Sequence, residues 1–147
     1  MFKSLLLALA VSAPVAALSA PAFACDDENP ETASAPMIVS PEQVNALIAA
    51  GATTPVDANN PDTRANYGVL PGAILLSSHE FAEGELPADH DAALVFYCGS
   101  ERCSAAPSAA ATAIELGYTN VSVMSAGIRG WVEAGYETQA AAAGEGK

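Results

Sequence analysis

The chain has 147 residues, of which 51% are hydrophobic, and it carries a formal net charge of −12 at pH 7. This length suits a single domain built around one core. So negative a charge argues against nucleic acid or an anionic membrane surface as a partner. It also repels small anions at long range. A site for an anionic substrate must therefore be made locally, from backbone N–H groups and a well-placed arginine.

The first 24 residues have the pattern of a secretory signal peptide. Lys3 precedes an apolar run over residues 5–18, and an A-x-A cleavage site ends at Ala24. The run is shorter than the ~20 apolar residues that span a bilayer. We therefore expect cleavage after Ala24 and a periplasmic or secreted protein. Lipidation at Cys25 is the weaker alternative, because the residues before it do not form a lipoprotein signal.

Five short apolar stretches bounded by turn residues are predicted to be strands. They are residues 37–39, 54–57, 73–76, 93–97 and 121–124. The fourth is a continuous apolar run, which suits a central strand buried on both faces. Residues 25–36 are acidic or small and indicate a flexible leader, and residues 138–147 indicate a disordered tail.

Helical patterns separate most of these strands. Ser40, with Pro41 and Gln43 after it, predicts the N-terminus of a helix that Gly51 ends. Further helices are predicted over residues 104–116 and from Gly127 to Ala134, and a helical turn over residues 79–85. The connection after Asp57 is rich in Asn, Pro and Gly, so we expect it to be long and irregular.

Alternation of strands and helices predicts an α/β domain with a mostly parallel sheet over residues 37–137. In such sheets, ligands bind where the strands end at their carboxyl edge. Cys98 comes directly after the 93–97 strand. The sequence therefore places this cysteine at the edge where a functional site is expected.

The loop from Cys98 to Cys103 is the main candidate site. Pro107 lacks an N–H group and fits only the first helical positions, so the next helix begins between Ser104 and Pro107 and the loop has six residues. Its amides can form an anion-binding nest, and the helix directs its positive end to the same place. Both effects favour a reactive thiolate at Cys98, with Arg102 beside it. The alternative is that Cys98 is only a small buried hydrophobic residue.

Four motifs in order make the sequence resemble a rhodanese-like domain over roughly residues 37–136. They are Val56-Asp57, residues 67–74 (YGVLPGAI) in place of the "GHIPGA" box, residues 95–98 (VFYC) with the following loop, and residues 126–131 (AGIRGW) in place of "GGxxxW". The resemblance implies an α/β sandwich with a central, mostly parallel five-stranded sheet flanked by helices.

The resemblance also implies a sulfurtransferase. Cys98 would attack a sulfane sulfur of thiosulfate or a persulfide, carry it as a persulfide, and pass it to a thiophilic acceptor such as a thiol, including one on a protein. No cofactor or metal is implied beyond this transient persulfide. Asp57 and Arg129 would have supporting roles. Substrate binding is implied for the positions after the nucleophile, which are Gly99, Ser100, Glu101, Arg102, Cys103 and Ser104.

Several positions depart from the family's pattern. Cys103 stands where arginine is common, Val69 replaces the box histidine, and no arginine follows Asp57. Glu101 adds a negative charge, which disfavours a dianionic donor and favours a persulfide or protein thiol. A phosphatase cradle would carry an arginine where Ser104 stands, so oxyanion phosphatase chemistry is the less favoured reading.

Cys103 is open to three interpretations: a passive small residue, a resolving thiol that closes a disulfide with Cys98, or a partner of Cys98 in a soft-metal site. Loop ends this close in sequence can reach the roughly 4.4–6.8 Å Cα separation of a disulfide. His79 and His90 are distant in sequence, which weakens the metal reading. The alternative to an enzyme is thus a redox or soft-metal and sulfur-binding module. Arg64 is expected to form a surface or structural ion pair rather than to bind substrate.

Overall fold

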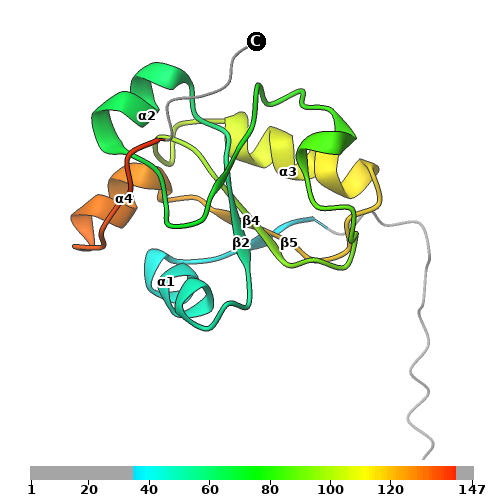
Figure 1. Ribbon diagram of the computed structural model, residues 1–147, viewed down its shortest axis with the longest axis horizontal. Coiled ribbons are helices and arrows are strands. Elements are labelled where there is room, and N and C mark those ends of the chain that lie inside the picture. The colour runs from blue at the N-terminus through cyan, green and yellow to red at the C-terminus, as the bar shows by residue number, and fades with distance from the viewer. Residues whose placement is uncertain (1–34, 142–147) are drawn as a thin grey trace, which may run out of the picture. The chain divides into compact units, whose positions relative to one another are not determined.

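The computed structural model describes residues 35–141, in which helices cover both faces of a five-stranded sheet (Figure 1). All strand pairs are parallel, in the order β1-β5-β4-β2-β3. The strands are β1 (Met37–Ile38), β2 (Thr54–Asp57), β3 (Ile74–Leu75), β4 (Leu94–Tyr97) and β5 (Val121–Met124). The predicted fold class is confirmed. The predicted signal peptide, Cys25 and most of the leader lie outside the described residues.

Four α-helices and one 3-10 turn are described within residues 35–141. They are α1 (Pro41–Ala49), α2 (Pro61–Tyr67), α3 (Ala105–Glu115), α4 (Gly127–Glu133) and the 3-10 helix η1 (Glu83–Glu85). Ser40 and Gln43 form the predicted capping box at the start of α1, with Pro41 as the first helical residue. The 3-10 turn is shorter than the helical turn predicted over residues 79–85.

The central strand β4 divides the core into two layers because its side chains alternate between the faces of the sheet. Leu94 and Phe96 pack on the face covered by α3, whose buried positions are all alanine. Val95 and Tyr97 pack on the other face, against residues of α1 and α4 that include Trp131. All four β4 side chains are buried, as the continuous apolar run predicted.

Helix α2 corrects the prediction of a long irregular connection after Asp57. Asn60 caps the helix by accepting a hydrogen bond from the Thr63 amide at 2.8 Å, and Pro61 is the first helical residue. Gly68, with a φ of 74°, ends it. None of the seven residues of α2 is buried. The helix therefore has no apolar stripe by which sequence periodicity would reveal it.

The predicted disordered tail, residues 138–147, begins before the folded domain ends. Gln139 pairs with Val69 in an antiparallel bridge, in which each amide donates to the other's carbonyl oxygen at 2.8 Å. Trp131 is buried as predicted, and its indole N–H donates to the carbonyl oxygen of Glu137 at 2.9 Å. Residues 138–141 therefore continue the folded domain, and the rest of the predicted tail lies outside the described residues.

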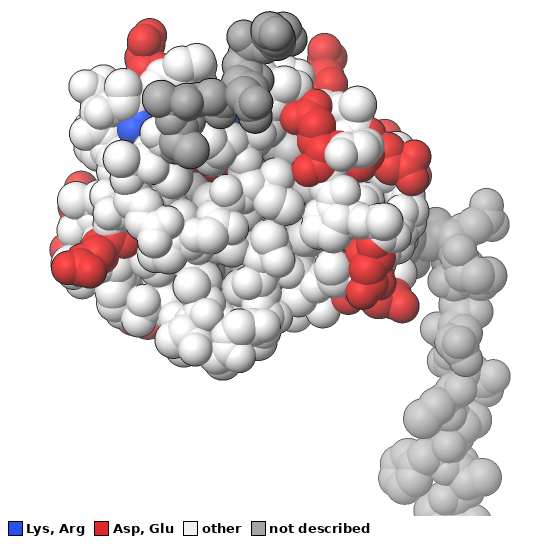
Figure 2. All heavy atoms as spheres, viewed as in Figure 1, with Lys and Arg blue, Asp and Glu red and all other residues white. Residues whose placement is uncertain are grey.

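Acidic side chains gather in groups around the rim of the face shown in Figure 2, while its centre is uncharged. Within residues 35–141, the Lys and Arg residues are Arg64, Arg102 and Arg129. None of the helices in this part of the chain has the length and apolarity needed to cross a bilayer. The local sources of positive charge are thus few.

Tyr97 links the central strand to the segment after α2, and this link can be tested. Its hydroxyl oxygen accepts a hydrogen bond from the Leu70 amide at 3.0 Å, and both residues are buried. Burial raises the pKa of Tyr97 far above its usual value, so the hydroxyl stays protonated. Tyr97→Phe leaves a buried amide without an acceptor, and we expect urea denaturation to show a loss of about 1–3 kcal/mol. Tyr136→Phe, at a half-buried ring, is the control, and an equal loss in both variants would contradict this role.

Candidate active site

The 98–103 loop connects the carboxyl end of β4 to the start of α3, as predicted. Ser104 is the N-cap residue of α3, although its side chain makes no capping hydrogen bond. Within the loop, the Cys103 amide donates to the carbonyl oxygen of Ser100 at 2.9 Å. This turn brings Cys103 back toward Cys98. The chain thereby places both thiols at one edge of the sheet.

The first turn of α4 fixes the orientation of the loop's peptide groups. The amide of Ile128 donates to the carbonyl oxygen of Cys98 at 2.7 Å, and the amide of Arg129 donates to that of Gly99 at 3.2 Å. The C=O and N–H of a trans peptide point in opposite directions. The amides of Gly99 and Ser100 therefore point away from α4 and into the loop, where they can stabilise negative charge.

Burial, the neighbouring thiol and the loop's amides all act on the pKa of each thiol. Burial and a hydrogen bond with Cys103 raise the pKa of the Cys98 thiol to about 11, against the opposing effect of the Ala106 amide. Burial also acts to raise the pKa of Cys103. Hydrogen bonds from Cys98 and from the amides of Gly99, Ala105 and Ala106 outweigh burial and hold the pKa of Cys103 below its usual value. The amides of Ser100 and Ala106 also act to lower the pKa of Cys98, so both thiols of the loop receive hydrogen bonds that stabilise negative charge.

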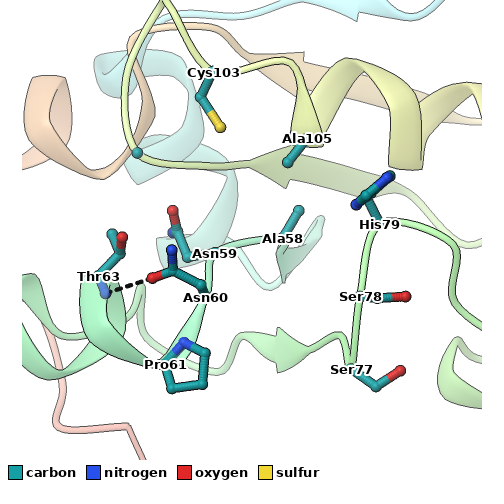
Figure 3. Close-up of a pocket in the computed structure, with 11 residues that line it drawn as sticks. Ala58, Asn59, Asn60, Pro61, Thr63, Ser77, Ser78, His79, Cys103 and Ala105 are labelled. Carbon is teal, nitrogen blue, oxygen red and sulfur yellow. Dashed lines mark hydrogen bonds between the residues drawn. The ribbon is translucent and has the colours of Figure 1, made fainter.

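A pocket of about 510 Å³ opens beside the loop, and Cys103 lines it (Figure 3). The sulfur of Cys103 points toward the segment that follows β2, where Ala58 and Asn59 are drawn. Cys98 is not among the residues that line this pocket. Its side chain is only 3% exposed, and its thiol is directed at the carbonyl oxygen of Cys103 at 3.4 Å. Of the two thiols, Cys103 is the one that faces the pocket.

The walls of this pocket carry polar but uncharged groups, with one histidine. Three segments contribute: the one after β2 with the start of α2, the one after β3, and the 98–103 loop with the start of α3. The lining residues are Ala58, Asn59, Asn60, Pro61, Thr63, Ser77, Ser78, His79, Gly99, Cys103 and Ala105. No Asp, Glu, Lys or Arg is among them. Any charge on a bound ligand would therefore meet amides, hydroxyls and an imidazole.

Asp57 supports the pocket wall rather than the loop. Its carboxylate is fully buried and accepts hydrogen bonds from the Asn59 amide at 2.7 Å and from the Asn59 side chain at 3.3 Å. Arg64 pairs with the same carboxylate at 3.0 Å, which confirms the predicted structural role of this arginine. The supporting role of Asp57 is therefore to hold Asn59 in the pocket wall.

Arg102 and Arg129 lie together, but in a different hollow. This second hollow, of about 390 Å³, shares no lining residue with the pocket of Cys103. Its residues are Ser100, Glu101, Arg102, Ala126, Arg129, Gly130 and Glu133. The guanidinium of Arg129 also lies 5.4 Å from the centre of the Tyr67 ring. The loop thus divides the predicted site, with Cys103 on one side and Arg102 on the other.

Sequence reasoning missed most of the pocket's polar residues. Asn59 and Asn60 follow β2, and Ser77, Ser78 and His79 follow β3. These residues could have been predicted from their positions, because residues just after each strand of a parallel sheet meet at the same carboxyl edge. Within residues 35–141, no three His, Cys, Asp or Glu side chains lie close enough together to hold a metal ion.

Residues 40–134 match the family model of the rhodanese-like domain. The chain belongs to this family. The match covers all four α-helices and every strand except β1. The comparison with curated proteins found no match.

Solved structures with this rhodanese-like fold include the polysulfide-sulfur transferase homodimer of Wolinella succinogenes, at 18% identity and a TM-score of 0.61 over 74% of this chain and 81% of that one. The human single-domain sulfurtransferase TSTD1 matches at 24% identity and a TM-score of 0.54, over 68% of this chain and 97% of that one. A Rhodopseudomonas palustris protein described as a possible tyrosine phosphatase matches at 22% identity and a TM-score of 0.58, over 71% of this chain and 85% of that one. At such identities these likenesses show a common fold.

Proposed function

We propose that this chain is a sulfurtransferase that carries sulfane sulfur as a persulfide on the 98–103 loop and passes it to a thiophilic acceptor. The observation that carries the proposal is a pair of cysteines on a loop whose peptide groups are oriented by α4, beside an open pocket. Cys98 holds the position of the family's nucleophile. Membership of the rhodanese-like family and the sulfurtransferases among its structural relatives support the same chemistry.

The proposed reaction needs no cofactor. A loop thiolate attacks the outer sulfur of the donor, a new S–S bond forms, and the leaving group departs with the electron pair of the old bond. Sulfite leaves from thiosulfate, and a thiolate leaves from a persulfide. An acceptor thiolate or cyanide then attacks the terminal sulfur, and the loop thiolate leaves. Amides directed into the loop stabilise the anionic persulfide between the two steps.

The charge distribution favours sulfur donors that do not depend on long-range electrostatic attraction to reach the site. The chain's net charge of −12 repels a dianion such as thiosulfate, and no basic Lys or Arg side chain lines the pocket. A persulfide on a small thiol or on a protein suffers less from this repulsion. The proposal therefore includes a thiol or persulfide partner, outside the cytoplasm if the predicted signal peptide is cleaved. N-terminal sequencing of the exported protein should then begin at Cys25.

Intact mass after treatment of the reduced protein with thiosulfate or glutathione persulfide tests the function. We expect a gain of one sulfur atom, which disappears on addition of excess thiol. The double variant Cys98→Ser with Cys103→Ser should lose the gain, whereas Cys25→Ser, outside the loop, should keep it. A wild-type protein that gains no sulfur from either donor would rule out the proposed activity.

A redox module is the second candidate, because the Cys98 thiol donates to the carbonyl oxygen of Cys103 at 3.4 Å, which holds the two free cysteines close together. In that case the two would close a disulfide without turnover. The same mass measurement separates the candidates. Loss of two hydrogens on oxidation, with no sulfur gained by the reduced protein, would favour the redox module.

A further inference from the structure

We infer that Asn59 determines which sulfur donors the site accepts, because its carboxamide oxygen favours a donor with an N–H group beside its sulfur. The cysteine of a peptide or protein carries such a group, and an inorganic oxyanion does not. The inference rests on the proposed function and names the substrate class of the same site. Cys98 remains the nucleophile, and Asn59 binds the donor that it attacks.

Asp57 fixes the orientation of the Asn59 side chain. The NH2 group of Asn59 donates to one carboxylate oxygen of Asp57 at 3.3 Å, and the Asn59 backbone amide donates to the other at 2.7 Å. Arg64 pairs with the same carboxylate at 3.0 Å. A carboxylate in an ion pair only accepts hydrogen bonds, so it must face the NH2 group of the carboxamide and not its oxygen. The carboxamide oxygen is therefore held on the side away from Asp57.

This oxygen opens onto the pocket beside the loop. It lies 3.7 Å from the position that a Cβ on Gly99 would occupy, and Figure 3 shows it turned toward the loop. Gly99 lines the same pocket and directly follows Cys98. Within residues 35–141 the oxygen accepts no hydrogen bond, yet every side-chain polar atom that is fully buried there has a partner. The oxygen is therefore accessible to a ligand.

A hydrogen-bond acceptor at this position discriminates between sulfur donors. A carbonyl oxygen binds N–H, O–H or S–H groups, whereas the oxygens of thiosulfate are themselves acceptors and carry negative charge. No Lys or Arg side chain lines the pocket to offset the repulsion. In a cysteine residue, the backbone N–H is attached to the same Cα as the side chain that carries the sulfur. This N–H can therefore reach Asn59 while the sulfur lies against the loop.

Asn60 presents the complementary group. Its carboxamide oxygen accepts the hydrogen bond from the Thr63 amide at 2.8 Å (Figure 3), so its NH2 group is the part left for a ligand. Asn60 lines the same pocket as Asn59. Two neighbouring side chains thus offer one acceptor and one donor, each fixed by a hydrogen bond within the protein. A peptide group has one N–H and one C=O, so it can pair with both.

The transfer step itself is that of the proposed reaction. The Cys98 thiolate bonds to the outer sulfur of the donor persulfide, the donor's S–S bond breaks, and the donor thiolate leaves with the electron pair. The proton of the persulfide stays on the transferred sulfur. Asn59 takes no part in these bond changes, so its contribution is confined to which donor binds.

Two persulfides that differ in an N–H group test the inference on the wild-type protein. N-acetylcysteine persulfide carries an amide N–H beside its sulfur-bearing chain, and mercaptopropionate persulfide has the same chain and carboxylate without that amide. Intact mass over time gives the rate of sulfur uptake from each. Dividing each rate by that of uncatalysed transfer to a free thiol removes differences in intrinsic reactivity.

We expect uptake from N-acetylcysteine persulfide to be at least about tenfold faster, which is the effect of one hydrogen bond to an otherwise unpaired acceptor. Equal rates would overturn the inference and leave the proposed function standing. No uptake from either donor would overturn both.

Asn59→Ala shows whether this side chain is the source of the preference. The variant also removes a hydrogen bond from Asp57, but a distorted pocket wall would slow both donors alike. Loss of the acceptor oxygen slows only N-acetylcysteine persulfide, so we expect the ratio of the two rates to fall close to one. Asn66→Ala, the same change at an exposed position of α2 outside the pocket, should keep the wild-type ratio. A preference that survives in Asn59→Ala would overturn the assignment to this residue.

Discussion

Replacing Gly127 by alanine should reduce sulfur uptake by about 100-fold, because misplacing reacting groups by about 1 Å has effects of this size. A Cβ at this position would lie 2.5 Å from the Cys98 carbonyl oxygen, 2.6 Å from the Ser100 nitrogen and 2.7 Å from the Gly99 carbonyl carbon. All three atoms are backbone, so no side chain can turn aside to make room. The loop itself must move, and its amides move with it.

The same substitution should destabilise the fold. Gly127 has a φ of 63°, which costs an alanine about 1–2 kcal/mol, and forced overpacking adds about 1–3 kcal/mol. Gly135→Ala is a matched control, because its φ is 84° but a Cβ there would meet nothing within 4 Å. That variant should show only the backbone cost in urea denaturation and full sulfur uptake. Retention of uptake within about twofold in Gly127→Ala would show that α4 does not position the loop.

Removing Arg64 should cause the largest loss of stability among the charged residues of the described range. Asp57 is fully buried, and the side chain of Arg64 is 12% exposed. Arg64 also donates to the carbonyl oxygens of Asp57 at 3.0 Å and of Leu76 at 2.8 Å, so it joins the ends of β2 and β3. Arg64→Ala leaves a buried carboxylate without its cation, which costs about 3–5 kcal/mol.

Urea denaturation of Arg64→Ala beside Arg102→Ala measures this contribution. Arg102 is exposed, so its replacement should change the unfolding free energy by no more than about 0.5 kcal/mol. Arg64→Lys should recover only part of the loss, because an ammonium cannot reproduce the three hydrogen bonds of the guanidinium. Equal stability of the two alanine variants would mean that the ion pair contributes nothing beyond a surface charge.

The parts of the fold that could be predicted are those with a local signal. The β4 run from Leu94 to Tyr97 is apolar at every position because both faces of the strand are covered. The capping box at Ser40 and the position of Pro107 marked two helix starts from single residues. Helix α2 had the cap but no buried residue, and its Asn and Pro content is equally typical of a loop.

The position of the candidate site could be predicted from the sequence, but the direction of its peptide groups and side chains could not. The position of Cys98 after a central strand was enough to locate the loop at the carboxyl edge of the sheet. The direction of the Gly99 and Ser100 amides depends on Ile128 and Arg129, which hold the carbonyls of the same two peptide groups from a distant part of the chain. Likewise, nothing near Arg102 in sequence indicates that it faces a different hollow from Cys103.

The dependence of the loop on α4 sets the smallest unit that can be transferred to another protein. Grafting residues 98–103 onto a new strand–helix junction would move both thiols but leave the carbonyls of Cys98 and Gly99 unpaired and free to rotate. The amides would then lose their common direction. A graft must also include the first turn of α4, with Gly127 to permit the close approach. For protein design, the functional unit here is two separate segments in a fixed relation rather than one continuous motif.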